Sequence, residues 1–173
     1  TLDLEQLREL LRKDTVLVAV CAVDSELGTV QPIREIAEIL KDYPNCRLHV
    51  DATQAVEKTE LVLDGVDTMS IAPHKFYGLN GSGLLVKKKH LVIEPQIHGG
   101  GSTTPYRSGT PALGLAVSIE TALRLALQGQ NERVAQIAAL NRRLRTELGK
   151  YPAVRFNSPE NAVPHILNLS VSG

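Results

Sequence analysis

Two polar residues come soon after short runs that we expect to be strands, and each could take part in chemistry. Asp51 directly follows the run RLHV, and Lys75 follows TMSIA after two further residues. A buried carboxylate is costly unless it has a partner, and a lysine that loses its water becomes the neutral amine that attacks a carbonyl. The plainer alternatives are that Asp51 caps the segment ATQAV and that Lys75 is a surface lysine at a strand end.

The spacing of these two residues favours a shared site. They lie 24 residues apart, and each follows one expected strand. The carboxyl ends of parallel strands meet at one edge of a sheet, where ligands bind. Pyridoxal phosphate (PLP) requires such a pair, because a lysine binds it covalently and an acid keeps its pyridine nitrogen protonated. The sequence therefore permits a PLP site built on Lys75 and Asp51.

Glycines and a helix start form a third group of candidates. HGGG occupies 98–101, and RSGTP occupies 107–111. We expect Thr110 to cap a helix that begins at Pro111, which would create an anion site at its N-terminus. A plain capped helix after a flexible loop is the alternative. The glycines fit neither a Walker loop, since no GK[ST] follows them, nor a Rossmann fingerprint.

The elements that must position these residues alternate between helix and strand in the first half. This order predicts an α/β fold with a mainly parallel sheet. We expect the strand at 15–23 to be buried on both faces, and a hinge at 129–130. Helices are expected at 2–11, from 32 to before 43, at 111–127 and at 131–148, and strands at 15–23, 47–50, 68–72, 81–87, 155–157 and 166–171.

Composition narrows the choice of partners. The chain has 173 residues, with 19 basic and 19 acidic side chains, so bulk charge indicates neither a nucleic acid nor a membrane surface. No apolar run is long enough to span a membrane. The amphipathic N-terminus is unlike a signal peptide, which favours the cytoplasm. Cys21 and Cys46 fit no zinc or disulfide pattern, no metal site is expected, and Cys21 is predicted to be a buried thiol.

Six segments together resemble the class-V PLP enzymes, and among them the cysteine desulfurases of the NifS and IscS kind. They follow the family's order and cover most of the chain, and the RSGT form favours this branch over the SufS-like one. The resemblance implies a fragment of PLP fold type I: part of the large domain at 1–128 and the start of a small α+β domain at 129–173. The segments are ELGTVQPI (26–33), HVDATQAV (49–56), HKFYG (74–78), GSGLLVKKK (81–89), HGGG (98–101) and RSGTP (107–111).

The resemblance also implies a role for each matching residue. Lys75 would hold PLP covalently, and Asp51 would pair with its pyridine nitrogen. Gln54 would bind the ring hydroxyl, and His74 would contact the phosphate. Thr110 would reach the phosphate bound by the neighbouring subunit, because the family forms homodimers with shared active sites.

The implied reaction converts L-cysteine to L-alanine and leaves a persulfide on an enzyme cysteine. The sulfur would pass to an acceptor protein for iron–sulfur clusters and thiolated cofactors. Neither Cys21 nor Cys46 occupies the family's persulfide position, which the resemblance places after the last residue of this chain. The family's ring-stacking histidine and phosphate loop are expected before its first residue. We therefore expect this chain alone to be inactive, and its uncovered apolar surface to favour oligomerisation.

Three departures from the family pattern keep other functions open. Asp24 and Ser25 stand where the family has two asparagines, Ala72-Pro73 replaces Ser-Gly, and 102–106 replaces a more polar run. One alternative is another class-V enzyme, such as a selenocysteine lyase or an aminotransferase. A second is a non-catalytic binding or scaffold protein that kept the fold.

Overall fold

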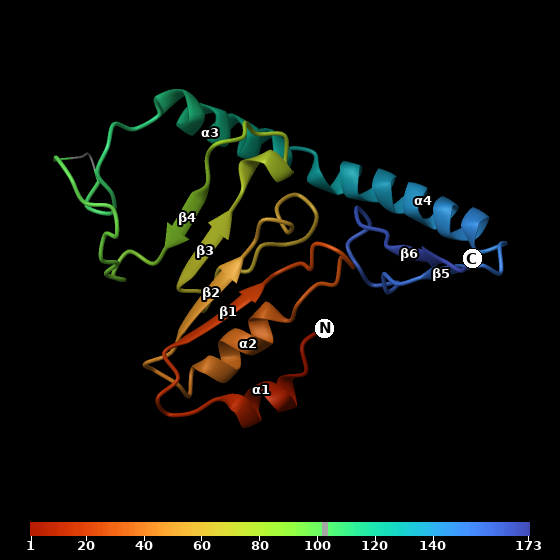
Figure 1. Cartoon of the computed structure of the whole chain (residues 1–173), viewed down its shortest axis with the longest axis horizontal. Coiled ribbons are helices and arrows are strands. Elements are labelled where there is room, and N and C mark those ends of the chain that lie inside the picture. The colour runs from red at the N-terminus through yellow and green to blue at the C-terminus, as the bar shows by residue number, and fades with distance from the viewer. Residues whose placement is uncertain (102–103) are drawn as a thin grey trace.

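A four-stranded sheet organises the first half of the chain. The computed structural model describes residues 1–101 and 104–173, so part of the departure at 102–106 lies outside the described residues. The strands stand in the order β1-β2-β3-β4; the first three are parallel, and β4 is antiparallel to β3 (Figure 1). The predicted α/β fold with a mainly parallel sheet is confirmed. The strands are β1 (Leu17–Cys21), β2 (Arg47–Asp51), β3 (Thr68–Ile71) and β4 (Leu84–Lys87).

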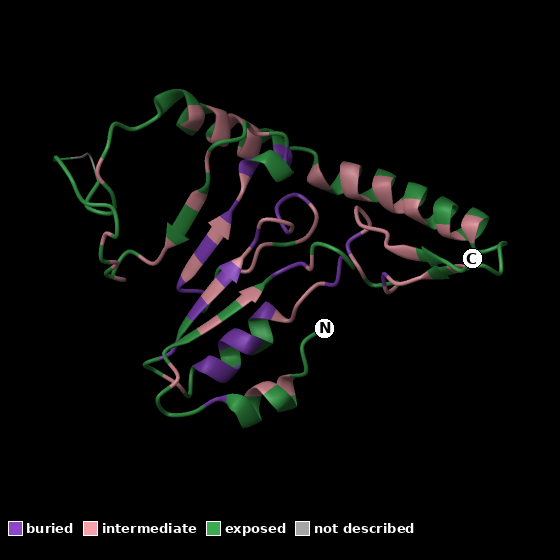
Figure 2. Cartoon of the chain, in the orientation of Figure 1, coloured by how far each residue is buried: buried purple, intermediate pink, exposed green. Residues whose placement is uncertain are grey.

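Two short helices accompany this sheet. α1 (Leu4–Leu10) starts after Asp3, whose carboxylate accepts hydrogen bonds from two main-chain N–H groups of the first turn. α2 (Ile33–Leu40) starts after Pro32 and buries five of its eight residues. Figure 2 shows these buried residues as a stripe along α2. Both helix starts agree with the sequence pattern.

The two faces of the sheet differ in burial. Leu48 and Val50 of β2 are 1% exposed and belong to the core beside α2, whereas Leu17 of β1 is 55% exposed on the opposite face. The expectation that 15–23 is a strand buried on both faces is therefore wrong, because no described element covers that second face. Cys21 lies on this open face and is exposed, so its predicted burial is also wrong.

Beyond β3 the regular structure of the chain is mainly helical. A short 3-10 helix, η1 (Pro73–Lys75), follows β3. Next come α3 (Leu113–Leu127) and α4 (Gln130–Leu148), with a left-handed Gly129 between them. A hairpin of β5 (Val154–Phe156) and β6 (Leu169–Val171) lies along α4 (Figure 1). Its presence confirms the α+β character of the last third of the chain.

The start of α3 differs from the expectation. Ala112 is the N-cap residue, and no side chain caps this helix. The main-chain N–H of Leu113 donates to the Pro111 carbonyl at 3.1 Å, so a tight turn precedes the helix. The prediction that Thr110 caps a helix beginning at Pro111 is therefore wrong.

Close contacts join the sheet to the last third of the chain. The Gly28 carbonyl accepts a hydrogen bond from the Val163 N–H at 2.9 Å. Gly28 has a φ of +75°, and a Cβ there would stand 3.0 Å from the Cβ of Ile166. The Gln130 amide also donates to the Thr59 carbonyl at 3.3 Å. Gly129 marks a break between α3 and α4, and the division into domains at 1–128 and 129–173 stays a prediction.

Candidate functional site

Asp51 and the segment carrying Lys75 come together at the carboxyl edge of the parallel strands. Asp51 is the last residue of β2, and Lys75 is the last residue of η1, which follows β3 directly. β2 and β3 are adjacent and parallel, and Asp51 is the register partner of Ser70. The strand ends thus place both residues at the edge where parallel sheets bind ligands.

The Asp51 carboxylate divides its two oxygens between two environments. Oδ1 accepts a hydrogen bond from the Thr53 N–H at 2.8 Å, so the capping alternative holds for this oxygen. Within the described part of the chain, Oδ2 receives no hydrogen bond, although the residue is half-buried. One oxygen is therefore available to a donor outside the chain, such as a protonated ring nitrogen.

Lys75 is exposed, so its amine is not removed from water in this chain. The next side chain, Phe76, is 1% exposed and occupies the core instead. Among the described residues, the Lys75 amine has no hydrogen-bond or ion-pair partner. The amine is therefore accessible to a carbonyl compound, and the surface-lysine alternative stays open.

Lys58 joins the two halves of the site, and the sequence patterns did not single it out. It is half-buried, and its Nζ donates to the Lys75 carbonyl at 3.4 Å. Burial lowers the pKa of Lys58; the attraction of Glu57 opposes this effect, and the repulsion of Lys75 adds to it. Its only signal in the sequence is its place just after HVDATQAV.

The remaining predicted residues fall into two groups. Gln54 is half-buried in the turn after β2, and His74 is exposed on η1, so both lie on the segments that carry Asp51 and Lys75. Thr110 is exposed in the segment before α3, and within the described residues it makes no hydrogen bond to the segments that carry the other four. The structure thus groups four of the five residues and leaves Thr110 apart.

Asp24 serves the turn that follows it. Its Oδ1 accepts hydrogen bonds from the N–H groups of Glu26 at 3.0 Å and Leu27 at 2.6 Å. This bonding pattern is typical of an Asx turn. The carboxylate at this departure from the family pattern thus has a local structural role.

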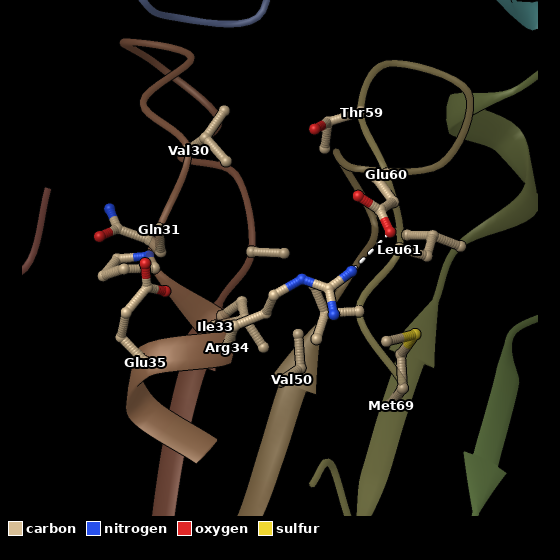
Figure 3. A pocket seen from close by; sticks show the side chains of 13 residues that line it. Val30, Gln31, Ile33, Arg34, Glu35, Val50, Thr59, Glu60, Leu61 and Met69 are labelled. Carbon is tan, nitrogen blue, oxygen red and sulfur yellow. Dashed lines mark hydrogen bonds and ion pairs between the residues drawn. The ribbon is translucent and has the colours of Figure 1, made fainter. Parts of the chain in front are cut away.

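A separate cavity of about 300 Å³ lies on the other face of the sheet (Figure 3). Val50 and Met69 line its apolar side, and an ion pair of 2.6 Å joins Arg34 to Glu60. Because Val50 precedes Asp51 by one residue, their side chains leave opposite faces of β2. The cavity is distinct from the Asp51–Lys75 site, and Arg34 and Glu60 already pair with each other in it.

Metal and membrane signals are lacking in the described residues. No group of three or more His, Cys, Asp or Glu side chains there could hold a metal ion. No helix in the same residues is both long and apolar enough to cross a bilayer.

Comparisons with known proteins place the fold and the family. A NifS-like protein of known structure superposes with a TM-score of 0.93 at 32% identity, covering 98% of this chain and 47% of the other. A NifS/IcsS protein homolog of Lactobacillus delbrueckii subsp. bulgaricus is 39% identical over 98% of this chain. The cysteine desulfurase IscS of Dictyoglomus turgidum is 34% identical over 97%.

The matches cover nearly all of this chain but less than half of each relative. The chain spans 45% and 43% of the lengths of these two relatives. The structural match shows the fold of NifS-like, PLP-dependent fold type I proteins. The family model "Aminotransferase class-V" matches residues 1–173. With the strand-end site and these similarities in agreement, the chain belongs to the class-V aminotransferase family.

Proposed function

We propose that the protein carrying this chain is a PLP-dependent cysteine desulfurase. One observation carries the proposal: Asp51 ends β2 and Lys75 ends η1, which follows the adjacent parallel strand β3, and one carboxylate oxygen and one amine are left without partners in the described residues. The names of the relatives support the choice of reaction within the family.

The residues present fit PLP in charge and in donor type. When bound, PLP supplies an electron sink for the bonds at the α-carbon of an amino acid. The Lys75 amine would bind its carbonyl carbon, and the free Asp51 oxygen would hold the proton of the ring nitrogen. Gln54 would bind the ring hydroxyl, and His74 would contact the phosphate. Lys58 fixes the main chain at Lys75 through its hydrogen bond.

The sulfur chemistry needs a cysteine other than the two in this chain. Cys46 is 5% exposed. Cys21 is exposed, but partial desolvation and then the charges of Asp51 and Asp24 raise the pKa of its thiol. Because the thiolate is the nucleophile, both settings disfavour sulfur transfer. We infer that this chain alone does not convert L-cysteine to L-alanine, and that the persulfide forms elsewhere in the whole protein.

Three further parts of the proposal stay predictions. They are a homodimer in which Thr110 serves the neighbouring site, a protein that accepts the sulfur for iron–sulfur clusters, and a cytoplasmic location. A selenocysteine lyase or an aminotransferase would use the same four residues at the strand ends. Product analysis with L-cysteine, L-selenocysteine and a keto acid separates these reactions.

The first test maps the lysine that binds PLP. The chain is incubated with PLP, reduced with borohydride, digested and analysed by mass spectrometry. We expect an adduct confined to Lys75 and absent from Lys75→Arg. Asp51→Asn should weaken PLP binding about tenfold or more, since it replaces a charged acceptor but keeps an oxygen for the Thr53 N–H.

The surface lysines at 87–89 serve as the internal control for this test. Labelling scattered over them, or no adduct at all, would contradict a formed site in this chain. Absence of PLP from the complete protein as well would favour the non-catalytic alternative.

A further inference from the structure

A row of polar side chains crosses the open face of the sheet beside Asp51. In the parallel register, His49 of β2 is opposite Thr68 of β3, and Asp51 is opposite Ser70. Residues two apart on a strand share a face, so the two β2 side chains and their two β3 partners all point the same way. His49 thus lies one step before the carboxylate of the proposed site.

The imidazole of His49 is engaged at both nitrogens. Nδ1 is 2.8 Å from the Thr68 Oγ1, and Nε2 is 3.4 Å from the Ser70 Oγ. A neutral imidazole donates from one nitrogen and accepts at the other, whereas a hydroxyl has a single hydrogen to donate. The protonation of His49 therefore decides where the Ser70 hydrogen can point.

Ser70 also stands next to Asp51 in the sheet, although no hydrogen bond joins the two side chains in the described structure. When Nε2 carries a hydrogen, the Ser70 oxygen accepts it, and the hydroxyl hydrogen is released for another acceptor. Across the strands, the side chain on the same face is that of Asp51, the register partner of Ser70. When Nε2 carries no hydrogen, Ser70 donates to it instead and offers nothing to the carboxylate.

We propose that His49 is a positioning residue that acts on the Asp51 carboxylate through the Ser70 hydroxyl. The inference rests on the proposed function, in which Asp51 holds the proton of the PLP ring nitrogen. In the described structure the Ser70 hydroxyl bonds only to His49, and turned toward its register partner it would orient the Asp51 carboxylate. His49 holds this hydroxyl in the required direction, and Thr68 fixes the other side of the ring.

The test uses the complete polypeptide that carries this sequence. Ser70→Ala removes the hydroxyl, Ser70→Thr keeps it, and His49→Phe removes both ring nitrogens at similar volume. Ser70→Ala and His49→Phe should each weaken PLP binding about three- to tenfold, the effect of one hydrogen bond. Ser70→Thr should keep the wild-type affinity for PLP. The double variant Ser70→Ala, His49→Phe should bind PLP no more weakly than either single variant, because both changes break the same link.

A second measurement uses the protein without PLP, so it does not depend on the loaded enzyme. The ring ¹⁵N shifts of His49 report its tautomer, and Ser70→Ala should change them while Ser70→Thr should not. If Lys75 still forms its adduct, but Ser70→Ala binds PLP as tightly as wild type and leaves the His49 ring shifts unchanged, the inference is overturned. Failure of the wild-type protein to form that adduct would instead overturn the proposed function itself.

Discussion

At the scale of single residues, the turn after Asp51 stores backbone strain beside a buried charge. Glu57 has a φ of +60°, and it is 4% exposed. Its Oε2 accepts no hydrogen bond within the described residues and lies 3.6 Å from the Arg133 guanidinium. A left-handed conformation costs a residue with a Cβ about 1–2 kcal/mol, and a buried ion pair often contributes little net stability.

Glu57→Gly tests this strain. Glycine adopts positive φ freely, and Arg133 keeps hydrogen bonds to the carbonyls of Gln128 and Leu125, so it is not left as an unpaired charge. Glu57→Ala is the matched control, since it loses the same ion pair but keeps the strain. We expect Gly to exceed Ala by about 1 kcal/mol in free energy of unfolding, measured by urea titration. Equal stabilities would show that the φ of residue 57 relaxes at no cost.

At the scale of elements, Asp67 ties three strands together where β3 begins. Its side chain is 8% exposed and accepts hydrogen bonds from the Leu48 N–H at 2.9 Å and the Lys88 ammonium at 3.1 Å. Its main chain also pairs with Leu48 and Lys88. Burial alone raises the pKa of Asp67, but these donors outweigh burial and lower the pKa overall. This carboxylate stabilises the register of β2, β3 and β4.

The lowered pKa of Asp67 fixes the sign of a pH dependence. A carboxylate whose folded pKa lies below its unfolded value stabilises the fold fully above the unfolded value, about 3.9. The contribution is lost as the pH falls through the folded pKa. We expect Asp67→Asn to cost about 2 kcal/mol at neutral pH, with the gap to wild type closing only below about pH 4. Urea unfolding across this range measures the gap.

The exposed Asp64 in the same connector provides the control for that experiment. It has no hydrogen-bond or ion-pair partner in the described residues, so Asp64→Asn should leave the stability unchanged at every pH. A gap for Asp67→Asn that stays constant into acid would contradict the role given to its charge.

Local patterns were enough to predict most elements. The apolar runs placed the helices and strands of the first half near their observed positions. Thr110 was assigned as a cap because the sequence does not reveal the tight turn from Pro111 that delays α3. The burial of 15–23 was wrong because an apolar run indicates a strand but not what covers each face.

The site shows the same limit of local patterns. Asp51 and Lys75 were found because polar residues after strands gather at one edge of a parallel sheet. The contacts of Lys58 with Lys75 and of His49 with Ser70 depend on the register and on the path of the chain between strands. No spacing in the sequence encodes them.

At the scale of the whole molecule, the described chain covers only one face of a largely parallel sheet. Such sheets are normally covered on both faces. On the open face, which also carries His49 and Asp51, Leu17 of edge strand β1 is 55% exposed and Leu85 of edge strand β4 is 54% exposed. The chain also spans less than half the length of its relatives. By itself, it therefore presents apolar surface that water solvates poorly.

This open face should make the isolated chain associate with itself. A second copy can bury the side chains of Leu17 and Leu85, which are unfavourably exposed to water in the monomer. Sedimentation equilibrium should show mass above that of the monomer, and the double variant Leu17→Lys, Leu85→Lys should return it to the monomer. The matched control is Leu63→Lys, which adds the same charge at a leucine 60% exposed in the connector before β3. A monodisperse wild-type monomer, or an equal effect of the control, would mean that the open face is not what drives association.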